Sequence, residues 1–236
     1  MEPPAEPVEG RAARTGSGRA VAWLVGVDAV TKWLAYLLLP HGREVRPEAL
    51  FQLVLFVNRG LGTWADAAVG EKVATARAIP NAFGTAALAL ALLGARRLKL
   101  RWGRAALLGG AAVILGFWAG VLASPWFHAL GFLGRERVEA VSRMLLVFVI
   151  WRQVAPSPWR AAVALWLAGV LGNSLCLFMP PFGAIDFVYS RPVDVVLRLG
   201  IFNLADVYQV AWLALVVVLA ARALMVRLTG RRGAAV

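Results

Sequence analysis

Long apolar runs alternate with short charged segments along this chain. Apolar runs of near-spanning length predict membrane helices, because a helix needs about 20 mostly apolar residues to cross the hydrocarbon core. Two of the runs are short at their strictest boundaries, so four or five spans are also considered. The runs lie at residues 20–39, 80–95, 105–123, 138–151, 161–179 and 205–225.

Two of the connecting segments are too long for simple turns. Residues 50–57 (LFQLVLFV) are β-prone and are expected to form strands on the outer leaflet, while residues 180–204 contain the IDFVY stretch. We therefore expect an all-α polytopic membrane protein of about six transmembrane helices with a small extracytoplasmic β-cradle. The membrane domain is residues 20–228, preceded by a disordered cytosolic tail at 1–19 and followed by a cytosolic tail at 229–236.

Composition and charge support this interpretation. The chain is 60% hydrophobic, against roughly 45 to 50% in a soluble domain, and its formal net charge is +12. When both termini are placed in the cytosol, the basic excess falls almost entirely on the inside segments, as the positive-inside rule requires. The charge therefore indicates membrane topology and makes a nucleic-acid partner improbable. One cysteine and no Cys/His cluster give no basis for a disulfide framework, a metal or another cofactor.

Two charged residues fall inside the first apolar run. Asp28 and Lys32 are four residues apart in GVDAVTKWL, so they share one helix face and can pair. Each charge at membrane depth costs about 2.5 to 3.5 kcal/mol on insertion scales, and such residues mark functional sites by default. An ion pair that only fixes a polar helix contact is an equally weighted alternative.

Three segments at the outer ends of the predicted spans carry further polar residues. Asn58 and Gly60, in VNRGLGTW, follow the β-prone run, where glycine permits positive φ and leaves room for a substrate backbone. Asn173 lies in LAGVLGNSLC, and Asn203 and Asp206 lie in FNLADVYQVAW. Their non-functional alternatives are a bare turn, close helix packing and helix capping, respectively.

In order and placement these segments resemble the bacterial lipoprotein signal peptidase family, also called signal peptidase II. That family combines a DxxxK first helix with NxG, GNxxDR, VVDF and FNxAD blocks. Each block is short, so the specificity lies in their order. The corresponding segments here are DAVTK (28–32), NRG (58–60), GNSLCL (172–177), AIDF (184–187) and FNLAD (202–206).

The resemblance implies an aspartic endopeptidase of the bacterial inner membrane, without a cofactor, that cleaves the signal peptide of diacylglyceryl-modified prolipoproteins. In this chemistry two carboxylates share a proton, and the ionised one activates water. Asp206 falls on the second catalytic aspartate. The implied substrate-binding residues are Asn58, Gly60, Asn173 and Asn203. The implied structural polar residues are Asp28, Lys32 and Asp186.

The chain departs from the family pattern in three places. The family has four membrane helices, so we expect an inserted helix pair at about 100–157, between the NxG and GN blocks. The aromatic residue expected after NxG occurs as Trp64 in altered spacing. The first catalytic aspartate of the family falls on Cys176, and the following arginine falls on Leu177.

A cysteine at position 176 changes the expected chemistry. A thiol is mostly neutral and does not share a proton as a carboxylate does, so we expect peptidase activity to be weak or lost. A nucleophilic route would need His41 or His128 as its base. In the simplest alternative, Cys176 is a small apolar residue that packs in the helix bundle.

Two other functions are considered. A noncatalytic relative would keep the lipopeptide groove and act as a binding or regulatory protein in the bilayer. A transporter or scaffold would use Asp28, Lys32 and Asp206 as a polar relay, but the sequence lacks the duplicated halves that transporters often show. We therefore rank the peptidase first and the transporter last.

Overall fold

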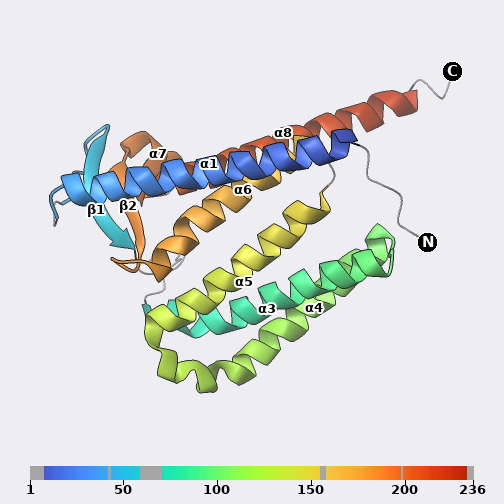
Figure 1. Cartoon of the computed structure of the whole chain (residues 1–236), viewed down its shortest axis with the longest axis horizontal. Helices are drawn as coiled ribbons and strands as arrows, with labels where there is room; N and C mark the ends of the chain where they lie inside the picture. The colour runs from blue at the N-terminus through green and yellow to red at the C-terminus, as the bar shows by residue number, and fades with distance from the viewer. Residues whose placement is uncertain (1–7, 42–43, 59–70, 155–157, 198, 233–236) are drawn as a thin grey trace.

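The structure is a computed structural model that describes residues 8–41, 44–58, 71–154, 158–197 and 199–232. It is mostly helical, with a small sheet at one end (Figure 1). The long helices are α1 (Val8–Leu38), α3 (Glu71–Arg97), α4 (Trp102–Ala123), α5 (Gly131–Gln153), α6 (Pro158–Leu175) and α8 (Leu204–Arg232). The shorter elements are η1 (Ser124–Leu130), η2 (Cys176–Phe178), α7 (Arg191–Leu197), β1 (Gln52–Asn58), β2 (Ala184–Tyr189) and β3 (Ile201–Phe202).

Five helices in the described part of the chain are long and apolar enough to cross a membrane. The exception among the long helices is α5, which contains the predicted span at 138–151. Its first half carries several charged side chains, among them Arg135, Glu136 and Glu139, and these lower its mean hydropathy. The prediction of about six apolar spans is therefore one too high by this criterion.

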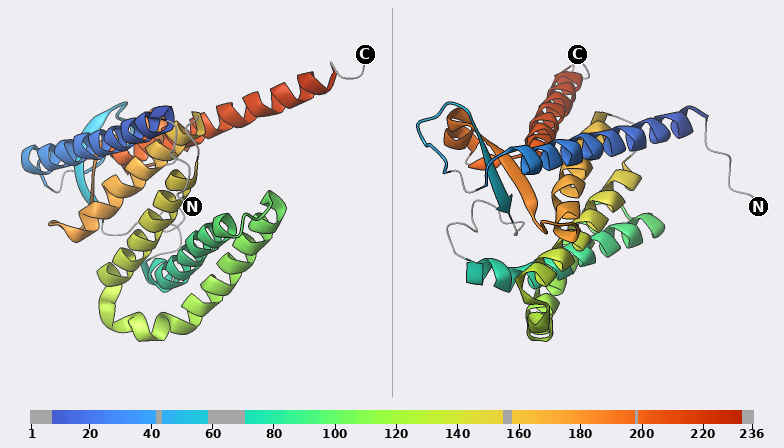
Figure 2. Two further views of the ribbon diagram at one scale, coloured as in Figure 1. Left: turned by 45° about the vertical axis from the view of Figure 1, so that its right-hand side comes forward. Right: turned by 60° about the vertical axis from the view of Figure 1, so that its left-hand side comes forward.

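Helix α5 nevertheless packs between other helices of the bundle. Figures 1 and 2 both show it between α6 and the α3–α4 hairpin, and it contacts α3 and α6. Its charged side chains Arg135, Glu136 and Glu139 are buried, with Glu139 in contact with Asn81 of α3 and Arg135 with the Phe127 carbonyl oxygen of η1. Charged side chains that neighbouring helices bury avoid the cost of contact with lipid, although the same helix exposes Val141, Leu145 and Phe148 on another face. The expected insertion at about 100–157 contains α4, η1 and α5.

The α3–α4 hairpin packs through small residues. A Cβ added at Gly116 would lie 2.7 Å from the carbonyl oxygen of Phe83, and one added at Gly120 would lie 2.6 Å from Cα of Pro80. These distances are shorter than van der Waals contact, so only glycine allows the two backbones to approach this closely. The four-residue spacing of the glycines is typical of close helix packing in membranes.

Helices α1, α6 and α8 form the part of the bundle that positions the polar site. Their apolar contact includes Val21, Leu167 and Ala168, which are buried in one hydrophobic cluster with Val147 of α5. Tyr208 of α8 packs against this cluster and donates a hydrogen bond to the carbonyl oxygen of Leu24. These contacts hold the three helices together below the sheet end of the bundle.

The three strands form one antiparallel sheet in the order β1-β2-β3. The β-prone run at 50–57 thus forms a strand, as predicted, and the AIDF segment forms the central strand. The register pairs Phe56 with Asp186 and Asn58 with Ala184. Asn58 is therefore a diagonal neighbour of Asp186 on the same face of the sheet, within reach of a side-chain contact.

The ends of the chain are more helical than the sequence analysis predicts. Helix α1 begins at Val8, within the segment expected to be a disordered tail, and α8 continues to Arg232. The Arg-Ala-Ala-Arg sequence at 11–14 consists of strong helix formers, so helix propensity extends α1 beyond its apolar run. The short helix α7 was also not predicted from its Pro/Arg/Asp-rich sequence.

Candidate functional site

The ion pair between Asp28 and Lys32 is at the base of a buried polar network. The ammonium group of Lys32 donates hydrogen bonds to Oδ2 of Asp28 at 2.7 Å, to the Gly172 carbonyl oxygen at 3.0 Å and to Oδ1 of Asn173 at 2.8 Å. All three ammonium donors are therefore satisfied. Asp28 and Lys32 are 0% and 1% exposed, which excludes water as their partner.

The carboxylate of Asp28 also joins α1 to α8. Its Oδ1 accepts a hydrogen bond of 2.9 Å from the backbone amide of Ala205 in the first turn of α8. A carboxylate at a helix N-terminus satisfies a free backbone donor and interacts favourably with the helix dipole. Asp28 and Lys32 pair, as their four-residue spacing predicts. Their further contacts fix the start of α8 and the end of α6.

Gly172 allows this three-helix contact. A Cβ added at Gly172 would lie 2.5 Å from Oδ2 of Asp28 and 3.0 Å from Cβ of Ala205. A side chain at position 172 would therefore separate α6 from both α1 and α8. The absence of a side chain brings the next residue, Asn173, against Lys32.

Asn173 connects the ion pair to Asp206. Its Nδ2 donates to Oδ1 of Asp206 at 2.8 Å, while its Oδ1 accepts from Lys32 and, at 3.0 Å, from Nδ2 of Asn203. The amide orientation is thus fixed by a cation on one side and a carboxylate on the other. Asn173 positions the side chain of Asp206, which is half-buried in the first turn of α8.

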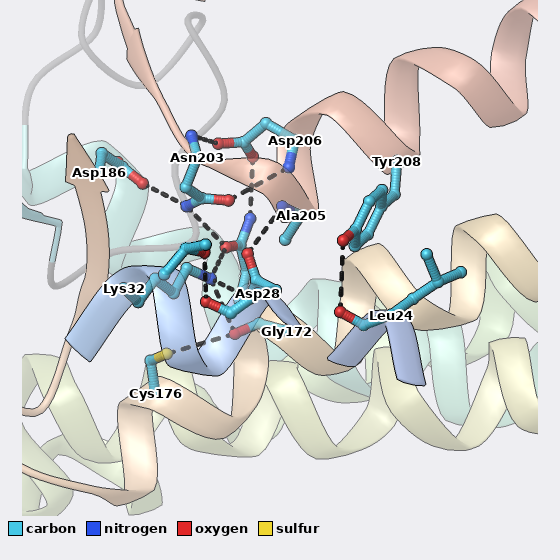
Figure 3. Close-up of polar contacts among 12 residues, drawn as sticks. Leu24, Asp28, Lys32, Gly172, Cys176, Asp186, Asn203, Ala205, Asp206 and Tyr208 are labelled. Carbon is cyan, nitrogen blue, oxygen red and sulfur yellow. Dashed lines mark hydrogen bonds and ion pairs between the residues drawn. The ribbon is translucent and has the colours of Figure 1, made fainter. Parts of the chain in front are cut away.

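Asn203 lies between two carboxylates, Asp186 of β2 and Asp206 of α8 (Figure 3). Its Nδ2 donates to Oδ1 of Asp186 at 2.5 Å, and its backbone amide donates to Oδ2 of Asp206 at 3.0 Å. Its Oδ1 in turn accepts from the backbone amide of Asp206 at 3.2 Å. Asn203 is an N-cap, as the alternative interpretation held, and it also brings the two acids together.

The carboxyl group of Asp186 is buried and electrostatically coupled to that of Asp206. Burial first, and the charge of Asp206 second, raise the pKa of Asp186 from 3.8 to about 8, against the opposing effects of hydrogen bonds from Asn203 and Asn58 and the charge of Lys32. At neutral pH Asp186 therefore holds a proton. Asn58, predicted from the sequence as a substrate-binding residue, contacts this carboxyl group.

Cys176, the residue predicted from the sequence to face Asp206, has a different neighbour. Its thiol donates to the Gly172 carbonyl oxygen at 3.3 Å, one turn earlier in the chain. Among the described contacts of Asp206, the side-chain partner from α6 is Asn173 rather than Cys176. The acid that accompanies Asp206 is Asp186, which the sequence analysis had placed among the structural polar residues.

Several other sequence predictions are not tested by these contacts. Gly60 and Trp64 lie outside the described residues, and the side chain of His128 is also not described. His41 is exposed and stacks edge-on against Tyr36, with ring centroids 5.2 Å apart. Within the described part of the chain, no group of three or more His, Cys, Asp or Glu side chains is placed to hold a metal ion.

The arrangement provides two carboxyl groups with different environments. Asp186 is 5% exposed and accepts a hydrogen bond from the Asn203 side chain, whereas half-buried Asp206 accepts hydrogen bonds from the Asn173 side chain and the Asn203 backbone. Such a pair can use one carboxylate as a base toward water while the other donates a proton. No family model matches the chain, and neither a curated protein nor a solved structure matches it. The function therefore has to be inferred from the residues of the site.

Proposed function

We propose that this chain is a membrane aspartic endopeptidase of the signal peptidase II type, with Asp186 and Asp206 as its catalytic pair. The observation that carries the proposal is the position of Asn203, which hydrogen-bonds both carboxyl groups. The substrate class, the signal peptide of a diacylglyceryl-modified prolipoprotein in a bacterial inner membrane, comes from the resemblance of the motifs. Both termini are cytosolic in this proposal.

In the proposed reaction Asp206 acts as the general base and Asp186 as the general acid. Asp206 removes a proton from water as the water oxygen bonds to the scissile carbonyl carbon, while Asp186 protonates the carbonyl oxygen. The tetrahedral intermediate then collapses, the C–N bond breaks and the leaving amine takes the proton from Asp206. The carbonyl oxygen returns its proton to Asp186, so both carboxyl groups regain their initial states.

The presence of Asp186 beside Asp206 removes the reason to expect weak activity. That expectation followed from Cys176 at a catalytic position, but the thiol contacts the Gly172 carbonyl instead. In the proposed mechanism Cys176 packs in the bundle and takes no part in proton transfer. We therefore expect Cys176→Ala to cleave at close to the native rate and Cys176→Asp to give no increase.

The proposal is tested by cleavage of a synthetic diacylglyceryl-modified prolipoprotein peptide by the full chain in detergent or lipid. Asp186→Asn and Asp206→Asn should each abolish cleavage. Asp194→Asn is the matched control, because Asp194 is an acid of the same segment whose carboxylate accepts from the Gly200 amide, away from the pair. Native cleavage that survives Asp186→Asn would refute the assignment.

The noncatalytic alternative predicts a different result in the same experiment. The native chain would bind the lipidated peptide without cleaving it, and the two Asp→Asn variants would bind it equally well. Loss of cleavage on thiol alkylation, with cleavage unaffected in Asp186→Asn, would instead favour a Cys176 nucleophile.

A further inference from the structure

The segment from Leu177 to Gly183 connects α6 to β2, and it therefore sets the position of Asp186 relative to Asn173. Leu177 is fully buried, and the backbone turns where the amide of Phe182 donates to the Met179 carbonyl oxygen at 2.7 Å. At its end, a Cβ added at Gly183 would lie 2.7 Å from the carbonyl oxygen of Asn58, so this segment packs directly on β1.

Arg137 of α5 holds this connecting segment at three points. Its Nε donates to the Leu177 carbonyl oxygen at 2.8 Å. Its guanidinium carbon lies 5.7 Å from the ring centroid of Phe178 and 5.3 Å from that of Phe182. Both distances are within the range of a cation–π interaction, which is stronger where the cation is shielded from water.

The contacts of Arg137 differ from those of Arg135 and Arg143 on the same helix. Arg143 pairs with Glu139 on the same helix, and Arg135 donates to the Phe127 carbonyl oxygen of η1. Among the described residues, no acidic side chain lies in hydrogen-bond or ion-pair contact with Arg137, and its side chain contacts Leu177, Phe178 and Phe182. The Arg137 guanidinium therefore does not serve to neutralise an acid of α5.

We propose that Arg137 is a positioning residue that holds the 177–183 segment so that β2 presents Asp186 to Asn203 and Asp206. Helix α5 thereby acts on the site through the Arg137 side chain. Arginine suits this role because its planar guanidinium can donate to a carbonyl and stack on aromatic rings together, which a lysine ammonium cannot do in the same geometry. The proposal rests on the proposed function for its effect on catalysis.

The test compares Arg137→Gln and Arg137→Lys with the native chain in two measurements. The first is cleavage of the diacylglyceryl-modified peptide, with kcat and KM determined separately. We expect Arg137→Gln to lower kcat by about 10-fold or more with KM within about twofold, because a small displacement of a reacting group has a large effect on rate. Arg137→Lys, which keeps the charge and part of the ring contact, should recover some of the lost kcat.

The second measurement is hydrogen exchange of the amides of residues 184–189, which needs no activity. Arg137→Gln should speed exchange in this strand and leave that of residues 24–38 in α1 unchanged. Arg143→Gln is the matched control, because it removes a cation from the same helix without touching the 177–183 segment. It should leave both kcat and strand exchange close to native.

The outcomes separate this inference from the proposed function. Unchanged strand exchange in Arg137→Gln overturns the inference, as does an equal effect of Arg143→Gln on kcat and exchange. If the native chain cleaves nothing while Arg137→Gln still speeds exchange at 184–189, the peptidase proposal fails. In that case the positioning of β2 by Arg137 is supported independently of the peptidase proposal.

Discussion

The side-chain amide of Asn173 donates a hydrogen bond of 2.8 Å to the carboxylate of Asp206. The same amide accepts from Lys32 at 2.8 Å, so a buried cation of α1 orients an acid of α8 through one residue of α6. The position of Asp206 therefore depends on two contacts that lie outside its own helix. This relationship makes the polar network testable one residue at a time.

We expect Asn173→Leu to lower kcat by about 100-fold, because it removes a hydrogen-bond donor to Asp206, the proposed general base. Cleavage kinetics of the lipidated peptide check this. Asn81→Leu is the control, since Asn81 is a half-buried asparagine of α3 that contacts Glu139 rather than the site. A native kcat in Asn173→Leu would show that Asp206 needs no support from α6.

Lys32→Met should lower the free energy of unfolding by about 3 to 5 kcal/mol, because it leaves the buried carboxylate of Asp28 without its cation. Denaturation of the protein in detergent measures the loss. The double variant Asp28→Leu/Lys32→Met should recover part of it, since it leaves no unpaired charge. Equal stability of Lys32→Met and the native chain would contradict the network.

Gly172→Ala should destabilise the bundle by about 1 to 3 kcal/mol, since its methyl group would meet Oδ2 of Asp28 at 2.5 Å. Gly110→Ala is a matched control, because Gly110 also lies in a helix and an added Cβ there meets nothing within 4 Å. Thermal unfolding of both variants makes the comparison. A melting temperature that falls as far in Gly110→Ala would point to a general effect of the added methyl group.

The raised pKa of Asp186 predicts that stability declines with rising pH. The folded state keeps the proton up to about pH 8, whereas the unfolded chain releases it near 3.8, so the stabilisation is fully present below 3.8 and is lost as the pH passes about 8. Thermal unfolding across this interval should show the decline, and Asp186→Asn should flatten it. A native profile that Asp186→Asn leaves unchanged would disprove the shift.

The rate of cleavage should also depend on the protonation of Asp186. The charged and polar groups that face Asp186 are Asp206, Lys32, Asn203 and Asn58. Because the proposed acid must hold its proton, kcat should fall as the pH rises through about 8. An activity that continues to rise above this pH would exclude Asp186 as the general acid.

Much of the helical architecture was predictable, because apolar runs of spanning length have few other structures available to them. Each predicted run overlaps one long helix, although the run at 161–179 continues past the end of α6 at Leu175, and the β-prone run forms β1. The hydropathy of α5 was harder to interpret, since Arg135, Glu136 and Glu139 oppose a span unless neighbouring helices bury them. Sequence patterns do not show which helices will surround a polar one.

The site was only partly predictable for a similar reason. The four-residue spacing of Asp28 and Lys32 predicts their pairing from helix geometry alone. The acid that lies beside Asp206 depends instead on the path of the chain from α6 to β2. Short sequence motifs do not show this path. The available signal was an aspartate, Asp186, in an otherwise apolar strand, where an unpaired acid would be costly.

The hydrogen bond from Ala205 to Asp28 spans 177 residues of the chain. During synthesis, α1 would enter the membrane with its acid neutralised only by Lys32, long before α8 is made. The first turn of α8 supplies both the Ala205 amide, which donates a hydrogen bond to Asp28, and the next residue, Asp206. The Asp28 carboxylate therefore gains its backbone donor, and Asp186 gains Asp206 as its neighbour, only when the last long helix docks.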